Sequence, residues 1–221
     1  MSDARDAAGS RDTVILVHGL WMSGLELSAL RHRLNSEFGF EALSYSYRSI
    51  TGTMADHVRG LRELAQAHGG AGQLHFVGHS LGGIVIFEML EGTQDLPQGR
   101  AVLLGSPLQG SSAVEGIAKW PMGRALVGNA VRDQVLTRPV RKWDGRRDLG
   151  IIAGDLSVGV GRIFANLTSA NDGTILVEET RIEGAKDHIV MPVSHTGMVF
   201  SAEVASEIAS FLHDGKFARL Q

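Results

Sequence analysis

A serine within a glycine-rich turn is the residue of this chain most able to do chemistry. Ser80 is the centre of the run Gly78-His79-Ser80-Leu81-Gly82, which lies between an apolar run at 74–77 and a helical pattern over 81–90. In a strand–turn–helix of this kind, the turn is so tight that the flanking positions accept only tiny side chains, and the serine is strained at its tip. Its hydroxyl then points to solvent near the positive end of the helix. We therefore predict that Ser80 is a nucleophile, with Gly83 allowing the helix to approach the sheet.

A serine hydroxyl needs a base to take its proton, and histidine has a suitable pKa at neutral pH. The histidines that follow Ser80 are His188, His195 and His213. His188 lies within a predicted strand, and His213 lies at the exposed end of the last predicted helix. His195 lies in the loop between that strand and that helix, from which a side chain reaches over the carboxyl edge of the sheet. Since the chain order in this arrangement is Ser, acid, His, we assign the base to His195.

Two carboxylates are candidates for the acid that holds the base in one tautomer and stabilises its charge. Asp155 directly follows the apolar run at 149–153. Asp172 lies in the loop Ser169-Ala170-Asn171-Asp172-Gly173, which has turn residues on both sides of the carboxylate and an apolar tail at 174–177 that can anchor it. We prefer Asp172 and keep Asp155 as the alternative.

Acyl chemistry at a serine also needs two backbone N–H groups aimed at the oxygen that becomes negative. The residue after the nucleophile, Leu81, supplies one. The other is expected in the loop after the first buried strand, which reads His18-Gly19-Leu20-Trp21-Met22. Gly19 permits the backbone to approach a substrate, so we predict that Leu20 is the second donor.

Short apolar runs alternate with amphipathic patterns along the whole chain. The run 14–17 is β-branched, continuous and short, which is typical of a strand buried on both faces. The alternation predicts an α/β fold, with about six mostly parallel strands flanked by helices. The predicted strands cover 14–17, 42–47, 74–77, 101–104, 149–153 and 188–191, and the main predicted helices begin near Ser23, Thr53, Leu81 and Ser201.

The segment 107–148 departs from this alternation. Its apolar residues are spaced like those of short amphipathic helices, and it contains no convincing strand. Such an insert above a sheet forms either a lid or a pocket wall, or else a crossover helix with an extra turn of packing. We interpret residues 1–221 as a single domain, with 1–11 as a flexible tail.

Composition excludes several classes of function. The net charge of −3 provides no basic field for nucleic acid, and the absence of cysteine excludes disulfides, cysteine-based zinc sites and a cysteine nucleophile. Asp, Glu and His are scattered without metal-ligand spacing, so we expect neither a metal nor another cofactor. No signal peptide or membrane-spanning run is evident, and we expect a soluble, cytoplasmic protein. Nothing in the sequence indicates an oligomeric state.

Together these residues resemble the small α/β-hydrolase lipases and esterases. The resemblance rests on His18-Gly19-Leu20, the Ser80 run, Leu104-Gly105-Ser106-Pro107-x-x-Gly110-Ser111, Asn171-Asp172-Gly173 and His195, in the order of that family. It implies a Ser80–Asp172–His195 triad, favours Asp172 over Asp155, and implies six strands in the order 2-1-3-4-5-6. Minimal lipases of this class can lack a lid, whereas this chain carries the insert 107–148.

The predicted function is hydrolysis of a carboxylic ester, with a small-molecule ester or lipid as substrate. A thioesterase or amidase would use the same triad, and a non-catalytic binding protein of this fold is a further alternative. Either Trp21, Met22, Trp120 and Met122 line an apolar acyl pocket or they are ordinary core residues. The basic residues between 119 and 147 indicate a solvated helix face, with contact to an anionic group, a carboxylate-bearing ester or a membrane surface as the alternative.

Overall fold

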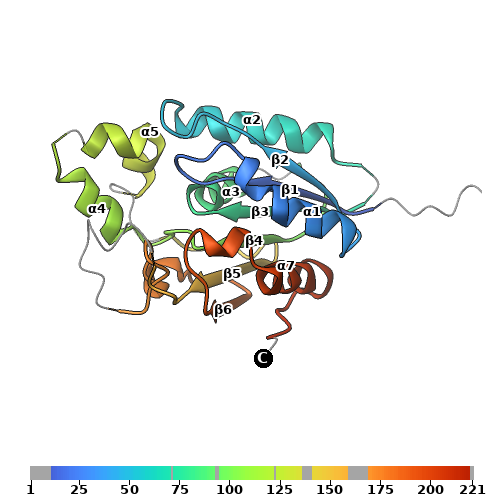
Figure 1. Ribbon diagram of the computed structural model, residues 1–221. Coiled ribbons are helices and arrows are strands. Elements are labelled where there is room, and N and C mark those ends of the chain that lie inside the picture. The colour runs from blue at the N-terminus through green and yellow to red at the C-terminus, as the bar shows by residue number, and fades with distance from the viewer. Residues whose placement is uncertain are drawn as a thin grey trace, which may run out of the picture.

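One parallel sheet organises the chain (Figure 1). The computed structural model describes residues 11–70, 72–92, 95–121, 123–135, 141–158 and 169–219. Within them the sheet has six strands in the order β2-β1-β3-β4-β5-β6, and all neighbouring pairs are parallel. This confirms the predicted fold class and the strand order that the resemblance implied. The strands are β1 (Thr13–Val17), β2 (Glu41–Tyr45), β3 (Leu74–His79), β4 (Ala101–Leu104), β5 (Leu149–Gly154) and β6 (Asp187–Met191).

Helices cover both faces of the sheet, as the apolar runs predicted. On one face α1 (Ser28–Ser36) and α7 (Ala202–Asp214) bury residues such as Leu30 and Ile208. On the other, α2 (Met54–Ala67) and α3 (Leu81–Glu91) form a second core. Strands β1 and β3 are buried along their whole length because they lie between these two layers.

The register of the strands brings their carboxyl ends to one edge. Val17 at the end of β1 is level with Tyr45 in β2 and Gly78 in β3, and His79 is level with Leu104 in β4. The loops that follow these strands therefore emerge on the same side of the molecule. In open α/β sheets this edge is where ligands bind.

Two helices of the insert lie beyond that edge. They are α4 (Ser112–Ala118) and α5 (Gly123–Val135), and α5 is kinked at Gly128. Figure 1 shows them apart from the two helical layers, next to the loops that leave the sheet. The short amphipathic helices predicted for this segment are thus present. Residues 136–140 and Met122 lie outside the described residues.

Helix starts follow local capping chemistry. At the predicted Thr53 start, Thr53 and Asp56 form a capping box for α2, in which each side chain accepts the other's backbone N–H. At the predicted Ser23 start, Glu26 accepts backbone N–H groups, but the turn continues as a 3-10 helix, η1 (Leu25–Leu27), and α1 begins only at Ser28. Two further 3-10 turns are η2 (Val177–Thr180) and η3 (Gly197–Val199).

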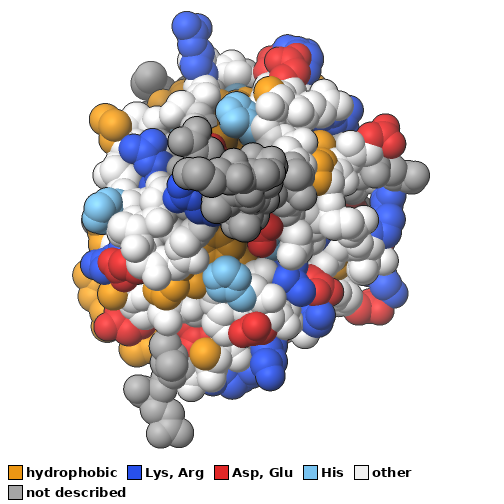
Figure 2. Space-filling view, turned by 90° about the vertical axis from the view of Figure 1, so that its right-hand side faces the viewer, with side chains coloured by type: hydrophobic (Ala, Val, Ile, Leu, Met, Phe, Trp, Pro, Cys, Tyr) orange, Lys and Arg blue, Asp and Glu red, His pale blue; other side chains and the backbone are white. Residues whose placement is uncertain are grey.

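The end of the molecule opposite α4 and α5 is shown in Figure 2. Acidic and basic side chains are interspersed on its visible, described part, so neither sign of charge dominates there. Among the helices that the structure describes, none combines the length and the apolar character that crossing a membrane requires.

Candidate active site

Ser80 occupies a sharp turn between β3 and α3. Its φ of 54° and ψ of −122° are rare for a residue with a side chain, and strain of this kind costs on the order of 1–3 kcal/mol. Glycine surrounds it for a steric reason: a Cβ on Gly82 would lie 2.2 Å from the Val17 carbonyl oxygen, and one on Gly83 would lie 2.0 Å from the Ser106 Oγ. The turn therefore exists only with glycine at these positions, as the motif predicted.

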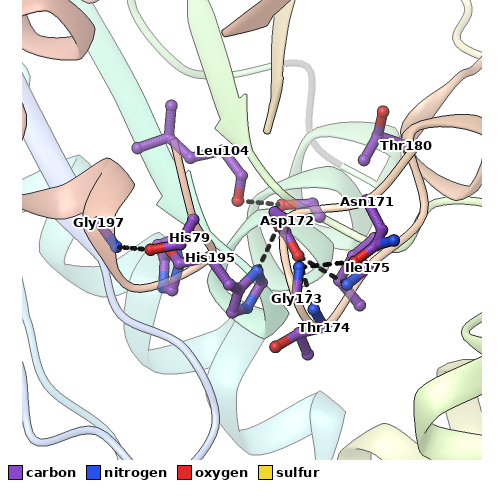
Figure 3. Close-up of polar contacts among 12 residues, drawn as sticks. His79, Leu104, Asn171, Asp172, Gly173, Thr174, Ile175, Thr180, His195 and Gly197 are labelled. Atoms are coloured by element: carbon purple, nitrogen blue, oxygen red, sulfur yellow. Dashed lines mark hydrogen bonds and ion pairs between the residues drawn. The ribbon is translucent and has the colours of Figure 1, made fainter. Parts of the chain in front are cut away.

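The acid and the base predicted from the sequence meet at this edge of the sheet (Figure 3). His195 Nδ1 lies 2.7 Å from Asp172 Oδ2, and the His195 backbone N–H donates to the Asp172 carbonyl oxygen at 2.8 Å. Asp172 is 1% exposed. A carboxylate only accepts hydrogen bonds, so in the neutral imidazole the proton lies on Nδ1 and Nε2 is the acceptor. This is the tautomer that a general base for a serine needs.

A tight loop presents the Asp172 carboxylate to the imidazole. Asp172 Oδ1 accepts the backbone N–H groups of Thr174 at 2.9 Å and Ile175 at 2.7 Å. Asn171 supports the loop by accepting the Gly173 N–H at 2.9 Å. The contacts of the Asp172 carboxylate with Thr174, Ile175 and the His195 ring are charge-assisted, and together they fix the direction of Oδ2. The alternative acid, Asp155, is exposed to solvent.

Gly105, which belongs to the Gly-Ser-Pro motif after the fourth strand, lies against the Asp172–His195 pair. Gly105 follows β4 with a φ of +52°, and a Cβ there would lie 2.9 Å from Asp172 Oδ2 and 3.1 Å from His195 Nδ1. Its N–H donates to the Ile152 carbonyl oxygen at 2.9 Å, which holds it in place. Gly105 therefore leaves room for the acid–base pair.

The loop after β1 is clamped by an aromatic residue that follows β2. The strand β2 ends at Tyr45, two residues earlier than predicted, so Tyr47 lies beyond it. The Tyr47 backbone N–H donates to His18 Nε2 at 3.2 Å, and its hydroxyl donates to the His18 carbonyl oxygen at 2.7 Å. Burial lowers the pKa of His18, which favours the neutral ring whose Nε2 accepts the Tyr47 N–H. These contacts fix the start of the loop that carries Gly19 and Leu20.

Both predicted oxyanion donors lie beside Ser80. Leu20 and Leu81 line the same cavity as Ser80 and His195. Leu81 is the first residue of α3, where backbone N–H groups have no carbonyl partner within the helix. A Cβ on Gly19 would lie 3.1 Å from the Ser80 Cβ, so the loop passes directly over the serine.

The cavity is largely apolar and has a volume of about 350 Å³, within the range of small-molecule sites. Ser80 and His195 lie in its wall, together with Trp21 and Met22 from the loop after β1. Helices α4 and α5 supply an apolar side of the cavity. Their lining residues are Ala113, Val114, Ile117, Val127, Val131 and Val135.

Of the three predicted pocket residues that the structure describes, two line the cavity. Trp21 and Met22 line it, while Trp120 at the end of α4 is 56% exposed and is not part of the described lining. Met122 falls outside the described residues. The lining from α4 and α5 was missed because it consists of small aliphatic residues, which resemble ordinary core in a sequence.

The basic residues of the insert do not form one solvated face. Arg141 is 5% exposed and donates to the Leu108 and Gln134 carbonyl oxygens at 3.0 and 2.7 Å. Arg147 packs over the Phe76 ring and donates to backbone oxygens at the start of β3 and before β4. The expectation of a solvated face is therefore wrong for these two residues, which join elements of the fold. Among the described residues, no group of three or more His, Asp and Glu side chains is placed to hold a metal ion.

A parallel six-stranded sheet with a serine in the turn after β3 and an Asp–His pair at the same edge has the architecture of an α/β-hydrolase. The family model described as "Alpha/beta hydrolase family" matches residues 14–197. The chain therefore belongs to the alpha/beta hydrolase family.

Solved structures share the fold at low sequence identity. The mature form of the Bacillus licheniformis lipase BlEst2 is 19% identical, with a TM-score of 0.72 over 98% of this chain and 96% of that chain. The metagenomic carboxyl esterase MGS0156 is 19% identical, with a TM-score of 0.65 over 96% of this chain and 73% of that one. The type II thioesterase BorB from the borrelidin biosynthetic cluster is 14% identical, with a TM-score of 0.60 over 96% and 95%. No curated protein matches this chain.

Proposed function

We propose that this hydrolase cleaves carboxylic esters with an apolar acyl group, through an acyl-enzyme on Ser80. One observation carries the proposal: the strained Ser80 and His195, which is paired with Asp172, both line an apolar cavity of about 350 Å³. The lipase and esterase among the solved structures of similar fold support the reaction class. The apolar lining of the cavity supports an apolar acyl group.

In the first half of the reaction, the Ser80 oxygen attacks the ester carbonyl carbon while His195 Nε2 takes the serine proton. The carbonyl oxygen becomes negative and accepts the N–H groups of Leu20 and Leu81. Asp172 stabilises the imidazolium that forms. The tetrahedral species then collapses, the ester C–O bond breaks, and His195 returns the proton to the leaving alcohol.

In the second half, a water molecule takes the place of the alcohol. His195 removes one of its protons while the water oxygen attacks the acyl carbon, and the same N–H groups receive the oxyanion. The bond to Ser80 breaks, and His195 gives the proton back to the serine oxygen. The products are a carboxylic acid and the free enzyme, with no other group consumed.

The walls of the cavity define the acyl group that fits. Val127, Val131 and Val135 on α5 and Ile117 on α4 offer only aliphatic surface. Each methylene buried against such surface contributes about 0.8 kcal/mol. In this proposal the helices α4 and α5 of the insert serve as the acyl-pocket wall.

The test is hydrolysis of p-nitrophenyl esters from acetate to palmitate by the native enzyme, Ser80→Ala and His195→Ala. Each variant should lose on the order of 10⁶ in kcat, and the double variant little more, because the residues act as a unit. His68→Ala, a change at an exposed histidine far from the site, is the control and should keep native activity. Absence of turnover on every ester by the folded native enzyme would refute the ester class, and thioesters and amides would then be assayed with the same variants.

A further inference from the structure

The peptide group of His195 is held from both sides. Its N–H donates to the carbonyl oxygen of Asp172 at 2.8 Å. Its C=O lies 2.9 Å from Nε2 of His79, the residue directly before the nucleophile. The two partners thus belong to the acid loop and to the serine turn. The backbone position of His195 is set by a contact between segments 116 residues apart in the chain.

His79 has the protonation state that this contact requires. A carbonyl oxygen only accepts, so Nε2 of His79 carries the proton. The ring is 1% exposed, and burial, together with the neighbouring His195, lowers the pKa of His79 to about 3. The ring is therefore neutral at ordinary pH and donates through one fixed nitrogen.

The same ring also packs against the base and the oxyanion loop. Its centroid lies 4.7 Å from the centroid of the His195 ring, with 46° between the planes (Figure 3). On its other side, Nδ1 of His79 would be 3.2 Å from a Cβ placed on Gly19. A single buried side chain thus contacts the loop of the base and the loop of Leu20, and is joined covalently to Ser80.

On this geometry we propose that His79 is a positioning residue, whose Nε2–H holds His195 in register with Ser80. The proposal rests on the proposed function, because it assigns His195 as the base. This positioning role requires a hydrogen-bond donor at the place of the His79 Nε2 atom and does not require an aromatic ring. A misplacement of reacting groups by about 1 Å costs on the order of 100-fold in rate, so loss of this donor should be visible in kcat.

The experiment compares His79→Phe, which keeps a ring but removes the donor, with His79→Gln, whose amide can donate near the Nε2 position. The control is His75→Phe, because His75 lies in the same strand, is 0% exposed and is at the opposite end from Ser80. For each protein we would measure kcat, KM and the thermal midpoint. His79→Phe should lower kcat by about 10- to 100-fold with KM within about threefold, while His79→Gln keeps kcat within about threefold. His75→Phe should lower the thermal midpoint and leave kcat unchanged.

A second readout separates this proposal from the identity of the substrate. A fluorophosphonate probe reacts with an activated serine: the Ser80 oxygen bonds to phosphorus, fluoride leaves, and His195 takes the proton. The labelling rate should follow the same order, with the native protein and His79→Gln fast and His79→Phe slow. If the native protein labels rapidly but cleaves no ester, the ester proposal fails while the role of His79 is still tested.

Two results would overturn the proposal. One is a His79→Phe enzyme with native kcat and labelling rate. The other is equal loss in His79→Phe and His79→Gln at equal thermal midpoints, because the donor would then be irrelevant. If His79→Phe does not fold, the labelling rate of His79→Gln against His79→Asn decides, since the shorter Asn amide does not reach the Nε2 position and should label slowly.

Discussion

Replacing Asp172 by Asn tests the acid at the atomic level. In the native loop Oδ1 accepts two backbone N–H groups, from Thr174 and Ile175, and Oδ2 faces His195 Nδ1. The new amide has two orientations. If its NH2 group faced the two backbone donors, the part-buried Thr174 N–H and the buried Ile175 N–H would lose their acceptor, which costs about 1–3 kcal/mol for a buried group. The amide oxygen therefore stays on the loop, and the NH2 group faces His195.

This orientation reverses the hydrogen bond to the base. Because the amide NH2 only donates, His195 Nδ1 must become the acceptor, and the imidazole proton moves to Nε2. Nε2 then has no lone pair to take the Ser80 proton. In serine hydrolases with the equivalent change, a wrong tautomer costs about 10⁴ in kcat. We expect a loss of that size, at a nearly native thermal midpoint since the shape of the side chain is kept.

The assay is kcat on the best p-nitrophenyl ester, with Asp155→Asn as the matched control. Asp155 follows the same strand but is exposed, and its substitution should leave kcat within about twofold of native because the changed group stays in water. A loss of less than about tenfold in Asp172→Asn, or a comparable loss in Asp155→Asn, would refute the reasoning.

Three other predictions concern the space and the protons around the site. Gly105→Ala places a methyl group 2.9 Å from Asp172 Oδ2 at a φ of +52°, so kcat should fall by at least tenfold while the thermal midpoint falls by only a few degrees; unchanged kcat would contradict this packing. Val131→Phe fills the acyl cavity and should move the ester optimum to shorter chains, with kcat/KM falling about fourfold for each methylene excluded; an unchanged optimum would remove Val131 from the acyl site. Burial lowers the pKa of His75 to about 4 and that of His79 to about 3, so below pH 6.5 the unfolded chain binds protons that the native protein does not. The stability that these two neutral histidines contribute should be fully present above that pH. As the pH drops, the free energy of unfolding, measured in urea, should fall by about 1.4 kcal/mol per pH unit for each histidine. In His75→Phe the slope should be smaller by about 1.4 kcal/mol per pH unit, and an unchanged slope would contradict the assignment.

Local patterns predicted the elements that carry the site. The run 14–17 and the turn around Ser80 were readable because a doubly buried strand and a glycine-flanked turn each depend on neighbours in the chain. The start of α2 near Thr53 was readable for the same reason. Prediction of the first helix was less accurate. Residues 25–27 form a 3-10 turn, whose hydrogen bonds span three residues where those of an α-helix span four, and sequence patterns hardly distinguish the two.

Choices between similar residues needed the tertiary structure. Asp155 and Asp172 both follow β5, and they differ in that only the second lies in a loop whose amides and imidazole partner surround the carboxylate. Trp21 and Trp120 are equivalent in a sequence, yet only Trp21 is part of the described cavity lining. Arg141 was grouped with exposed basic residues and proved to be buried among carbonyl oxygens.

By itself, then, the sequence determined the fold class and the identity of the serine turn, because both arise from periodicity and from steric limits within a few residues. It also indicated His195 through its loop between the last strand and the last helix, and Asp172 through the turn residues around it and the family resemblance. The tertiary structure decided what those residues touch: the acceptor pattern of Asp172, the space left by Gly105 and the contact of His79 with His195. Such contacts join segments far apart in the chain, and their geometry is set by strand register and loop packing rather than by any local pattern.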